Sequence, residues 1–457
     1  MKRIIIYLLC LLPMFNSCLD IRLDNQFSDP YAITTTATAR ELLASAYNSL
    51  PRFQYELSVL SDDFYRTQYS RQDAEIQNLY LWQETALTNL SDQVWQGYYL
   101  TVSYLNALLQ RVDNVVTEGE DDALELRKVI SEAKTLKAIC YFDLLRFYAP
   151  PYSEADAEKD GIILKDRLEL DFLPRSSVKD CVEAISGLLD DASEVVNVSP
   201  VYYLGTDALN AVRAEFELYL GHYDKVIEYG LPLMSGVESR WTEGAYNNLW
   251  NDNESAERIF APYIFDSFYI NLNYDKEKGD YFRLSDNVVY GDTDVRKAWC
   301  EYAGPMAGVR CLGKYNRMYY ENTEVRYINT LRYSGVCFTV AEAYARDGQE
   351  DEAIALMNRY LGARGASLLP ESIAGEELLE AVLSEKQKEF VGEGTRYFDL
   401  KRLRMDVPRY DADGSQTSVV KGNDYRRLLP IPQSEYKYNR NITEANQNPG
   451  WSYEKTE

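Results

Sequence analysis

The clearest helical pattern in the chain runs from Ser131 to Pro151, with the sequence SEAKTLKAICYFDLLRFYAPP. Apolar residues recur at helical spacing on one face, and a second apolar strip lies beside it. A helix that is apolar over most of its circumference is usually buried among other helices. Pro150 and Pro151 end it, because proline has no amide hydrogen and restricts the preceding residue. The acidic run from Glu118 to Asp122 is predicted to be a solvated turn. The stretch therefore predicts a mainly α fold whose loops carry the function.

Two later stretches repeat one pattern at a constant offset. Residues 214–227 match residues 341–354, and Gly221 aligns with Gly348. In each copy a helix ends at the glycine and a second amphipathic helix begins after a short turn, as in a tetratricopeptide-like hairpin. The copies are not adjacent and lack the full consensus. They predict degenerate helical hairpins that form the scaffold of a single domain.

The segment Ser384–Arg404, SEKQKEFVGEGTRYFDLKRLR, also has helical periodicity. Glu389, Glu393 and Arg396 share one face of the expected helix. Such a face usually forms a fixed ion-pair network that holds neighbouring elements together.

Between the two hairpins, residues 240–325 form a segment rich in loops and aromatic residues. From 241 to 320, 17 of 80 residues are Trp, Tyr or Phe, against 13% of the whole chain. Trp250 and Phe260 are predicted to be core residues, whereas polar neighbours favour exposure of Tyr281, Tyr290 and Trp299. An aromatic, loop-rich insertion on a helical scaffold is predicted to carry the ligand-binding face. The alternative is a satellite hydrophobic cluster beneath long loops.

The N-terminus has the pattern of an export signal. Lys2 and Arg3 precede an apolar run that is too short to span a membrane. Residues 1–17 are predicted to be a lipoprotein signal peptide, Cys18 the lipidated first residue of the mature protein, and residues 19–39 a polar tether. The alternative is an ordinary signal peptide with a chance cysteine. Residues 18–457 are then predicted to form one domain, held on a membrane by its acyl chains.

The overall charge and the cysteines narrow the classes of partner. The formal net charge of −24 disfavours nucleic acid, whose phosphates require a basic surface. No cysteine spacing indicates a zinc site or a disulfide framework. Cys300 and Cys311 could pair across a loop, and their spacing leaves this open.

Few catalytic groups stand out in the sequence. His222 is the only histidine and is predicted to be a surface residue of a hairpin turn, so a Ser/His triad is excluded. Glycoside hydrolysis needs only two carboxylates, and 72 acidic residues leave it open. The oxygen-rich turns 251–254 and 411–414 lack the spacing of an EF-hand, so calcium binding is unassigned and no cofactor is predicted.

The chain resembles the SusD/RagB family of outer-membrane lipoproteins in Bacteroidota. The resemblance rests on the cysteine at position 18, the helix from Ser131, the two hairpins, the motifs within Glu385–Arg402, and the closing segments 430–432 and 446–450. It implies a scaffold of tetratricopeptide-like hairpins and a non-enzymatic, lipid-anchored protein on the outer membrane that faces the cell exterior. It also implies a SusC/RagA-like TonB-dependent transporter as partner.

The ligand that the resemblance implies is an oligosaccharide, or a peptide for the RagB-like members. The family's starch contacts do not transfer residue by residue, because the insertion does not match its pattern closely. We therefore predict ligand contacts from loop position and chemistry alone. The candidates are Tyr65, Arg66, Tyr69, Arg71, Trp82, Tyr281, Tyr290 and Trp299.

Overall fold

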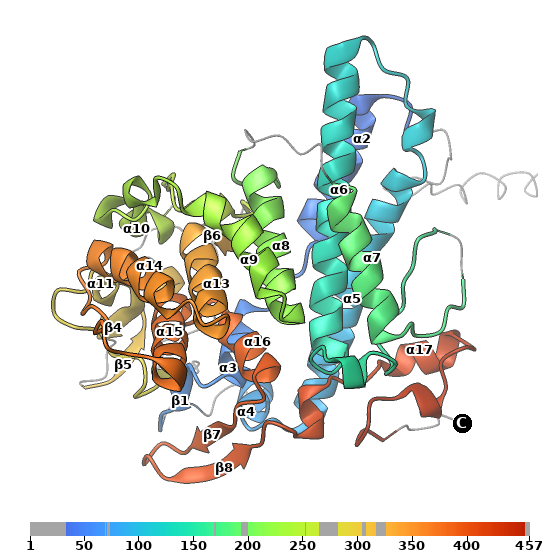
Figure 1. Cartoon of the computed structure of the whole chain (residues 1–457). Helices are drawn as coiled ribbons and strands as arrows, with labels where there is room; N and C mark the ends of the chain where they lie inside the picture. The colour runs from blue at the N-terminus through green and yellow to red at the C-terminus, as the bar shows by residue number, and fades with distance from the viewer. Residues whose placement is uncertain are drawn as a thin grey trace, which may run out of the picture.

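A computed structural model describes residues 33–68, 70, 74–168, 171–192, 200–251, 253–264, 282–303, 308–316 and 326–452. Within these ranges the chain is mainly helical, with tall helices on one side of the molecule and shorter hairpins on the other (Figure 1). One hydrophobic core runs through both sides. The predicted mainly α fold is confirmed.

The tall side is built from the N-terminal helices, of which α2, α5, α6 and α7 pack against one another. Thr35 caps α2, so this helix begins inside the segment predicted to be a tether. The tall helices are α2 (Thr36–Ser49), α5 (Glu84–Leu109), α6 (Glu120–Tyr148) and α7 (Val178–Asp190). The short helices α3 (Gln54–Leu60) and α4 (Ala74–Tyr80), which come between α2 and α5 in the sequence, lie near the middle of the molecule (Figure 1).

Helix α6 contains the apolar stretch from Ser131 to Tyr148, and the structure buries most of that stretch. The prediction of a turn over Glu118–Asp122 is wrong for its last three residues, because Glu120, Asp121 and Asp122 form the first turn of α6. Carboxylates are favoured there by the partial positive charge of the helix N-terminus. The helix ends at Tyr148, before the two prolines, as predicted.

The shorter side contains both predicted hairpins, α8 (Thr206–Leu220) with α9 (Tyr223–Gly230) and α13 (Tyr333–Arg346) with α14 (Glu350–Ala363). Gly221 and Gly348 have φ angles of +81° and +77°. Only glycine adopts such angles without strain, which is why it ends the first helix of each pair. Helix α13 packs against both α8 and α9, so the two hairpins form one array.

The helix predicted over Ser384–Arg404 is two helices, α15 (Gly375–Phe390) and α16 (Thr395–Arg402). Gly392 and Gly394, with φ angles of +78° and +81°, form the turn between them. Three further short helices whose bounds lie within the described residues are α10 (Glu243–Leu249), α11 (Lys297–Cys300) and α17 (Gln433–Tyr438).

The strands of the described residues form antiparallel pairs rather than a continuous sheet. Several of them belong to the predicted insertion, where Trp250 and Phe260 are fully buried as predicted. The pairs are β1 (Phe64–Arg66) with β3 (Phe282–Leu284), β2 (Arg258–Phe260) with β6 (Leu331–Arg332), β4 (Glu301–Ala303) with β5 (Arg310–Leu312), and β7 (Val407–Tyr410) with β8 (Gln416–Val420).

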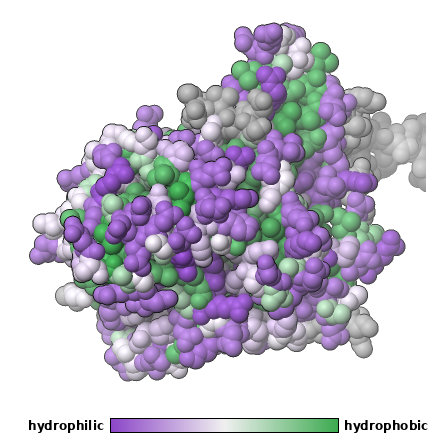
Figure 2. All heavy atoms as spheres, in the orientation of Figure 1, coloured by the Kyte–Doolittle hydropathy of each residue, from purple (hydrophilic) through white to green (hydrophobic). Residues whose placement is uncertain are grey.

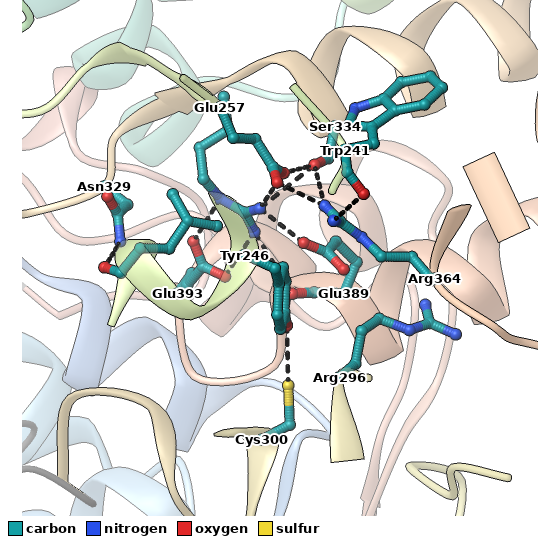
Figure 3. Close-up of polar contacts among 12 residues, drawn as sticks. Trp241, Tyr246, Glu257, Arg296, Cys300, Asn329, Ser334, Arg364, Glu389 and Glu393 are labelled. Carbon is teal, nitrogen blue, oxygen red and sulfur yellow. Dashed lines mark hydrogen bonds and ion pairs between the residues drawn. The ribbon is translucent and has the colours of Figure 1, made fainter. Parts of the chain in front are cut away.

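A buried ion-pair network joins the insertion to the second hairpin and α15 (Figure 3). Glu257, Glu389 and Glu393 each contact the guanidinium of Arg332, at 2.9, 2.6 and 2.8 Å. Burial alone would raise the pKa of Glu389, but the charges of Arg332 and of three further cations together outweigh burial and lower the pKa to about 2. The predicted ion-pair network is confirmed, although Arg396 pairs elsewhere, with Asp62.

The cysteines that lie within the described residues are all buried and unpaired. Cys300 and Cys311 are both free thiols, so the disulfide that the spacing left open does not form. His222 is exposed in the turn between α8 and α9, as predicted, with its Nδ1 2.7 Å from Glu217.

Candidate ligand-binding site

The structure places the predicted ligand-contact residues in several separate environments. Trp82 is buried, and its indole N–H donates a 3.1 Å hydrogen bond to the carbonyl of Leu60. Tyr290 is also buried, with its hydroxyl donating to the carbonyl of Lys388. The predicted exposure of Tyr290 is therefore wrong, and neither ring offers a free face to a ligand.

Tyr65 and Arg66 are held by neighbouring elements. The ring of Tyr65 lies 4.6 Å from that of Tyr410 and beneath the guanidinium of Arg283. Arg66 lies 3.7 Å from the carboxylate of Asp411, which supplies the anion that a peptide carboxylate would otherwise provide.

Trp299 is half-buried, and its indole N–H donates to Asn247. Its role as a ligand contact stays a prediction. The remaining candidates, Tyr69, Arg71, Tyr281 and the lipidation site Cys18, lie outside the described residues.

A deep cleft opens where the two sides of the molecule meet. It holds about 190 Å³ that water can enter, which is room for on the order of a dozen water molecules. Its walls come from the connection between α2 and α3, from α6 and α8, from residues 328–331, and from the turn between α15 and α16. These walls are far apart in the sequence, so no single motif marks the cleft.

Close glycine contacts hold the connection between α2 and α3 in the cleft wall. A Cβ on Gly97 of α5 would lie 2.9 Å from the side chain of Pro51. On the other side, a Cβ on Gly394 would lie 3.1 Å from the Cα of Gln54. Because both positions lack a side chain, residues 50–54 can pack between α5 and the start of α16.

Each carboxylate of the cleft is paired with a base. Asp143 and Glu215 both contact Arg146. Asp399 lies 2.8 Å from Lys386; burial would raise its pKa, but Lys386 and a second cation outweigh burial and lower it to about 2. The fourth, Glu393, belongs to the buried network.

The pairing of these carboxylates bears on catalysis. A glycosidase needs one carboxyl group that holds its proton near neutral pH, beside a second that is ionised. A carboxylate beside a cation favours its ionised form and is a poor proton donor. The cleft therefore does not favour the hydrolase that the number of acidic residues left open.

An antiparallel ribbon leads from the cleft wall to a pair of tyrosines. Residues 258–264 run beside 326–332, and beyond β2 and β6 Tyr263 faces Tyr327 across the ribbon. The two ring centroids lie 4.9 Å apart, with the rings at 75° to each other. Tyr263 is 36% exposed.

Two further tyrosines flank this ribbon. The amide of Ala261 donates a 2.7 Å hydrogen bond to the carbonyl of Val201, which brings the next two residues alongside. These are Tyr202, which is 41% exposed, and Tyr203, whose ring centroid lies 4.8 Å away. We call Tyr202, Tyr203, Tyr263 and Tyr327 the tyrosine edge.

Sequence reasoning missed the tyrosine edge. The aromatic enrichment of residues 240–325 could have pointed to Tyr263, but nothing in their local sequence marks Tyr327 or Tyr202. Figure 2 shows that hydrophilic residues cover much of the visible face, with hydrophobic residues gathered along the upper part of the tall helices. Two of the large hydrophobic residues exposed in the described part of the chain, Tyr202 and Tyr263, belong to the tyrosine edge.

The described ranges contain neither a metal-binding cluster nor a membrane-spanning helix. There, no group of three or more His, Cys, Asp or Glu residues is placed to hold a metal ion. Among the same residues, no helix combines the length and the apolar character needed to cross a bilayer.

Comparison with known proteins agrees with this architecture. Residues 236–451 match the family model described as "SusD family", and residues 19–212 match one described as "Starch-binding associating with outer membrane". A curated relative, a SusD-like protein of Formosa agariphila, is 21% identical over 87% of this chain and 90% of its own length.

Solved structures show the same fold. A SusD superfamily protein from Bacteroides vulgatus has a TM-score of 0.77 at 20% identity, covering 92% of this chain and 100% of its own. A SusD-like carbohydrate binding protein from the same organism has a TM-score of 0.74 at 17% identity, covering 90% and 98%. The fold is thus that of the tetratricopeptide-like SusD superfamily. The chain belongs to the SusD/RagB family, a family of carbohydrate-binding proteins.

Proposed function

We propose that this protein captures oligosaccharides at the outer membrane and delivers them, uncleaved, to a SusC/RagA-like TonB-dependent transporter. The observation that carries the proposal is the tyrosine edge, in which the rings of Tyr202 and Tyr263 are exposed beside the cleft. A tyrosine ring offers a flat apolar face to the C–H groups of a sugar, and its hydroxyl can exchange hydrogen bonds with sugar hydroxyls. Membership of the family supports the same ligand class.

The proposed attachment and domain organisation follow the sequence. Residues 1–17 would be removed as a signal peptide, and Cys18 would carry the lipid that holds the single domain 18–457 on the cell exterior. Each methylene group of an acyl chain that is buried in the bilayer stabilises the attachment by about 0.8 kcal/mol. Metabolic labelling with palmitate should mark the wild-type protein and not Cys18→Ser; equal labelling of both would contradict this assignment.

The peptide-binding alternative gains no support from Arg66, since its guanidinium is already paired with the carboxylate of Asp411. Peptides are therefore included as ligands in the binding test. A panel of neutral oligosaccharides and short peptides, examined by calorimetry with the acyl-free protein, separates the two ligand classes. Analysis of the mixtures after incubation tests cleavage, and any product would contradict the proposed capture without hydrolysis.

Tyr263→Ala and Tyr327→Ala test the site itself. Loss of a stacking ring should weaken oligosaccharide binding by about tenfold in each variant. Tyr438→Ala is the matched control, because Tyr438 is 67% exposed on α17 and outside the tyrosine edge. Unchanged affinity in both ribbon variants would show that the tyrosine edge is not the binding surface.

A further inference from the structure

Arg52 is a cation of the cleft without an anionic partner. It lies in the connection between α2 and α3 and lines the cleft, where its side chain is half-buried. Among the described residues, no hydrogen bond or ion pair involves its guanidinium. Burial lowers the pKa of Arg52, and no nearby carboxylate offsets that effect.

The other cations of the cleft differ from Arg52 because each has a partner. Arg146 contacts two carboxylates, Lys386 contacts Asp399, and Arg402 contacts Glu342 and Asp399. Lys401 has no carboxylate, but its ammonium donates to two carbonyls at the C-terminal end of α6. The C-terminal end of a helix carries partial negative charge, so these carbonyls stabilise the ammonium group of Lys401.

An unpaired guanidinium in a cleft is energetically unfavourable. Removing a charge from water costs free energy unless another charge or several hydrogen bonds replace the water. Arginine cannot avoid that cost by losing its proton, because its pKa remains far above neutrality. The planar guanidinium is also suited to bidentate contact with an oxyanion.

The rest of the cleft favours a hydroxylated partner. Arg146 neutralises only one charge of the Asp143–Glu215 pair, and the side chain of Glu215 is 37% exposed. Its carboxylate can accept hydrogen bonds from hydroxyl groups. The cleft thus combines one unpaired cation with acceptors for hydroxyls, and its volume is sufficient for about one sugar residue.

We propose that the cleft binds an acidic saccharide whose oxyanion, a carboxylate or a sulfate ester, pairs with Arg52. This rests on the proposed capture of oligosaccharides and narrows it to charged ones. The neutral part of the chain would extend along the tyrosine edge, since Phe260 and Pro262 of the same ribbon line the cleft.

The test compares three disaccharides by calorimetry: one with a hexuronic acid, one with a sulfate ester, and the neutral counterpart. The wild-type protein should bind at least one acidic disaccharide about tenfold more tightly than the neutral one. Arg52→Gln should abolish that preference while retaining the affinity for the neutral sugar. The preference should also weaken as salt increases. Whichever acidic sugar is preferred identifies the oxyanion.

Arg167→Gln is the control, because Arg167 is an exposed arginine outside the cleft. Since Arg52 has no partner to lose among the described residues, Arg52→Gln should unfold at a temperature no lower than the wild type. Equal affinity of the wild type for the three sugars, or equal effects of the two substitutions, would overturn the inference and leave neutral oligosaccharide capture standing. Arg52-dependent binding of acidic peptides without any saccharide binding would overturn both.

Discussion

The pH dependence of stability can be predicted from Asp63, because it is a fully buried carboxyl group beside another carboxylate. Burial is the main cause that raises its pKa to about 7, and the charge of Asp62 adds to it. The neighbouring Asp62 is paired with Arg396 at 2.8 Å, whereas Asp63 has only the amide of Gly392 and the side chain of Gln387 as hydrogen-bond donors.

The sign of the effect follows from the proton balance. Below pH 4 both the folded and the unfolded chain hold the proton of Asp63. Between pH 4 and 7 the unfolded chain releases the proton and the folded chain keeps it, so stability falls as the pH rises. Above pH 7 Asp63 is ionised in both the folded and the unfolded chain, and the loss of stability no longer changes with pH. With a pKa of about 7 against 3.8, the full loss is about 4 kcal/mol.

Asp63→Asn removes this titration. Relative to the wild type, the variant should gain about 3 kcal/mol in the free energy of unfolding between pH 5 and pH 8. Urea denaturation at several pH values measures the difference. Its absolute level also reflects the altered hydrogen bond with Gln387, so the change with pH is the diagnostic quantity.

Asp406→Asn is the matched control. Asp406 is exposed, and hydrogen bonds from Lys421 and Gly422 lower its pKa, so its titration lies below this pH range. The difference between this variant and the wild type should be constant from pH 5 to 8. A constant difference for Asp63→Asn as well would refute the assignment of a proton to Asp63.

Two further predictions concern stability. Arg332→Met should reduce the free energy of unfolding by about 3–5 kcal/mol in urea denaturation, because it leaves buried carboxylates without their shared cation. The control, Lys421→Met, removes the exposed ion pair with Asp406 and should cost under about 1 kcal/mol of stability. Equal losses of stability in the two variants would contradict the energetic role of the buried network. Gly394→Ala should lower stability by about 2–3 kcal/mol, because it adds a clash with the Cα of Gln54 to an unfavourable φ of +81°. Gly236→Ala, at φ +67° with open space around it, should cost about 1 kcal/mol in the same denaturation assay; an equal loss would argue against the close packing at Gly394.

Local sequence patterns were sufficient where neighbouring residues decide the structure. Helical periodicity predicted α6 from Ser131 onward, and the glycine that ends each first helix predicted both hairpins. The same reasoning failed at the break between α15 and α16. There the periodicity continues through Gly392 and Gly394, and the close packing of Gly392 against Leu312 and of Gly394 against the start of α3 favours a turn.

The site was harder to predict, because exposure and pairing depend on distant parts of the chain. Polar neighbours in sequence favoured exposure of Tyr290, yet the folded chain buries its ring, and the carbonyl of Lys388 in α15 accepts its hydroxyl hydrogen bond. Arg66 and Arg52 look equally free in the sequence. Only the folded chain brings Asp411 to Arg66 and leaves Arg52 without a carboxylate.

The amino-acid sequence by itself thus determined the helical scaffold, its two hairpins and the family, because periodicity and turn residues act over a few positions. The tertiary structure decided which rings are exposed and which charges are compensated. The reason is physical: Asp62 and Arg396, or Tyr263 and Tyr327, meet only after folding has closed the long loops between them.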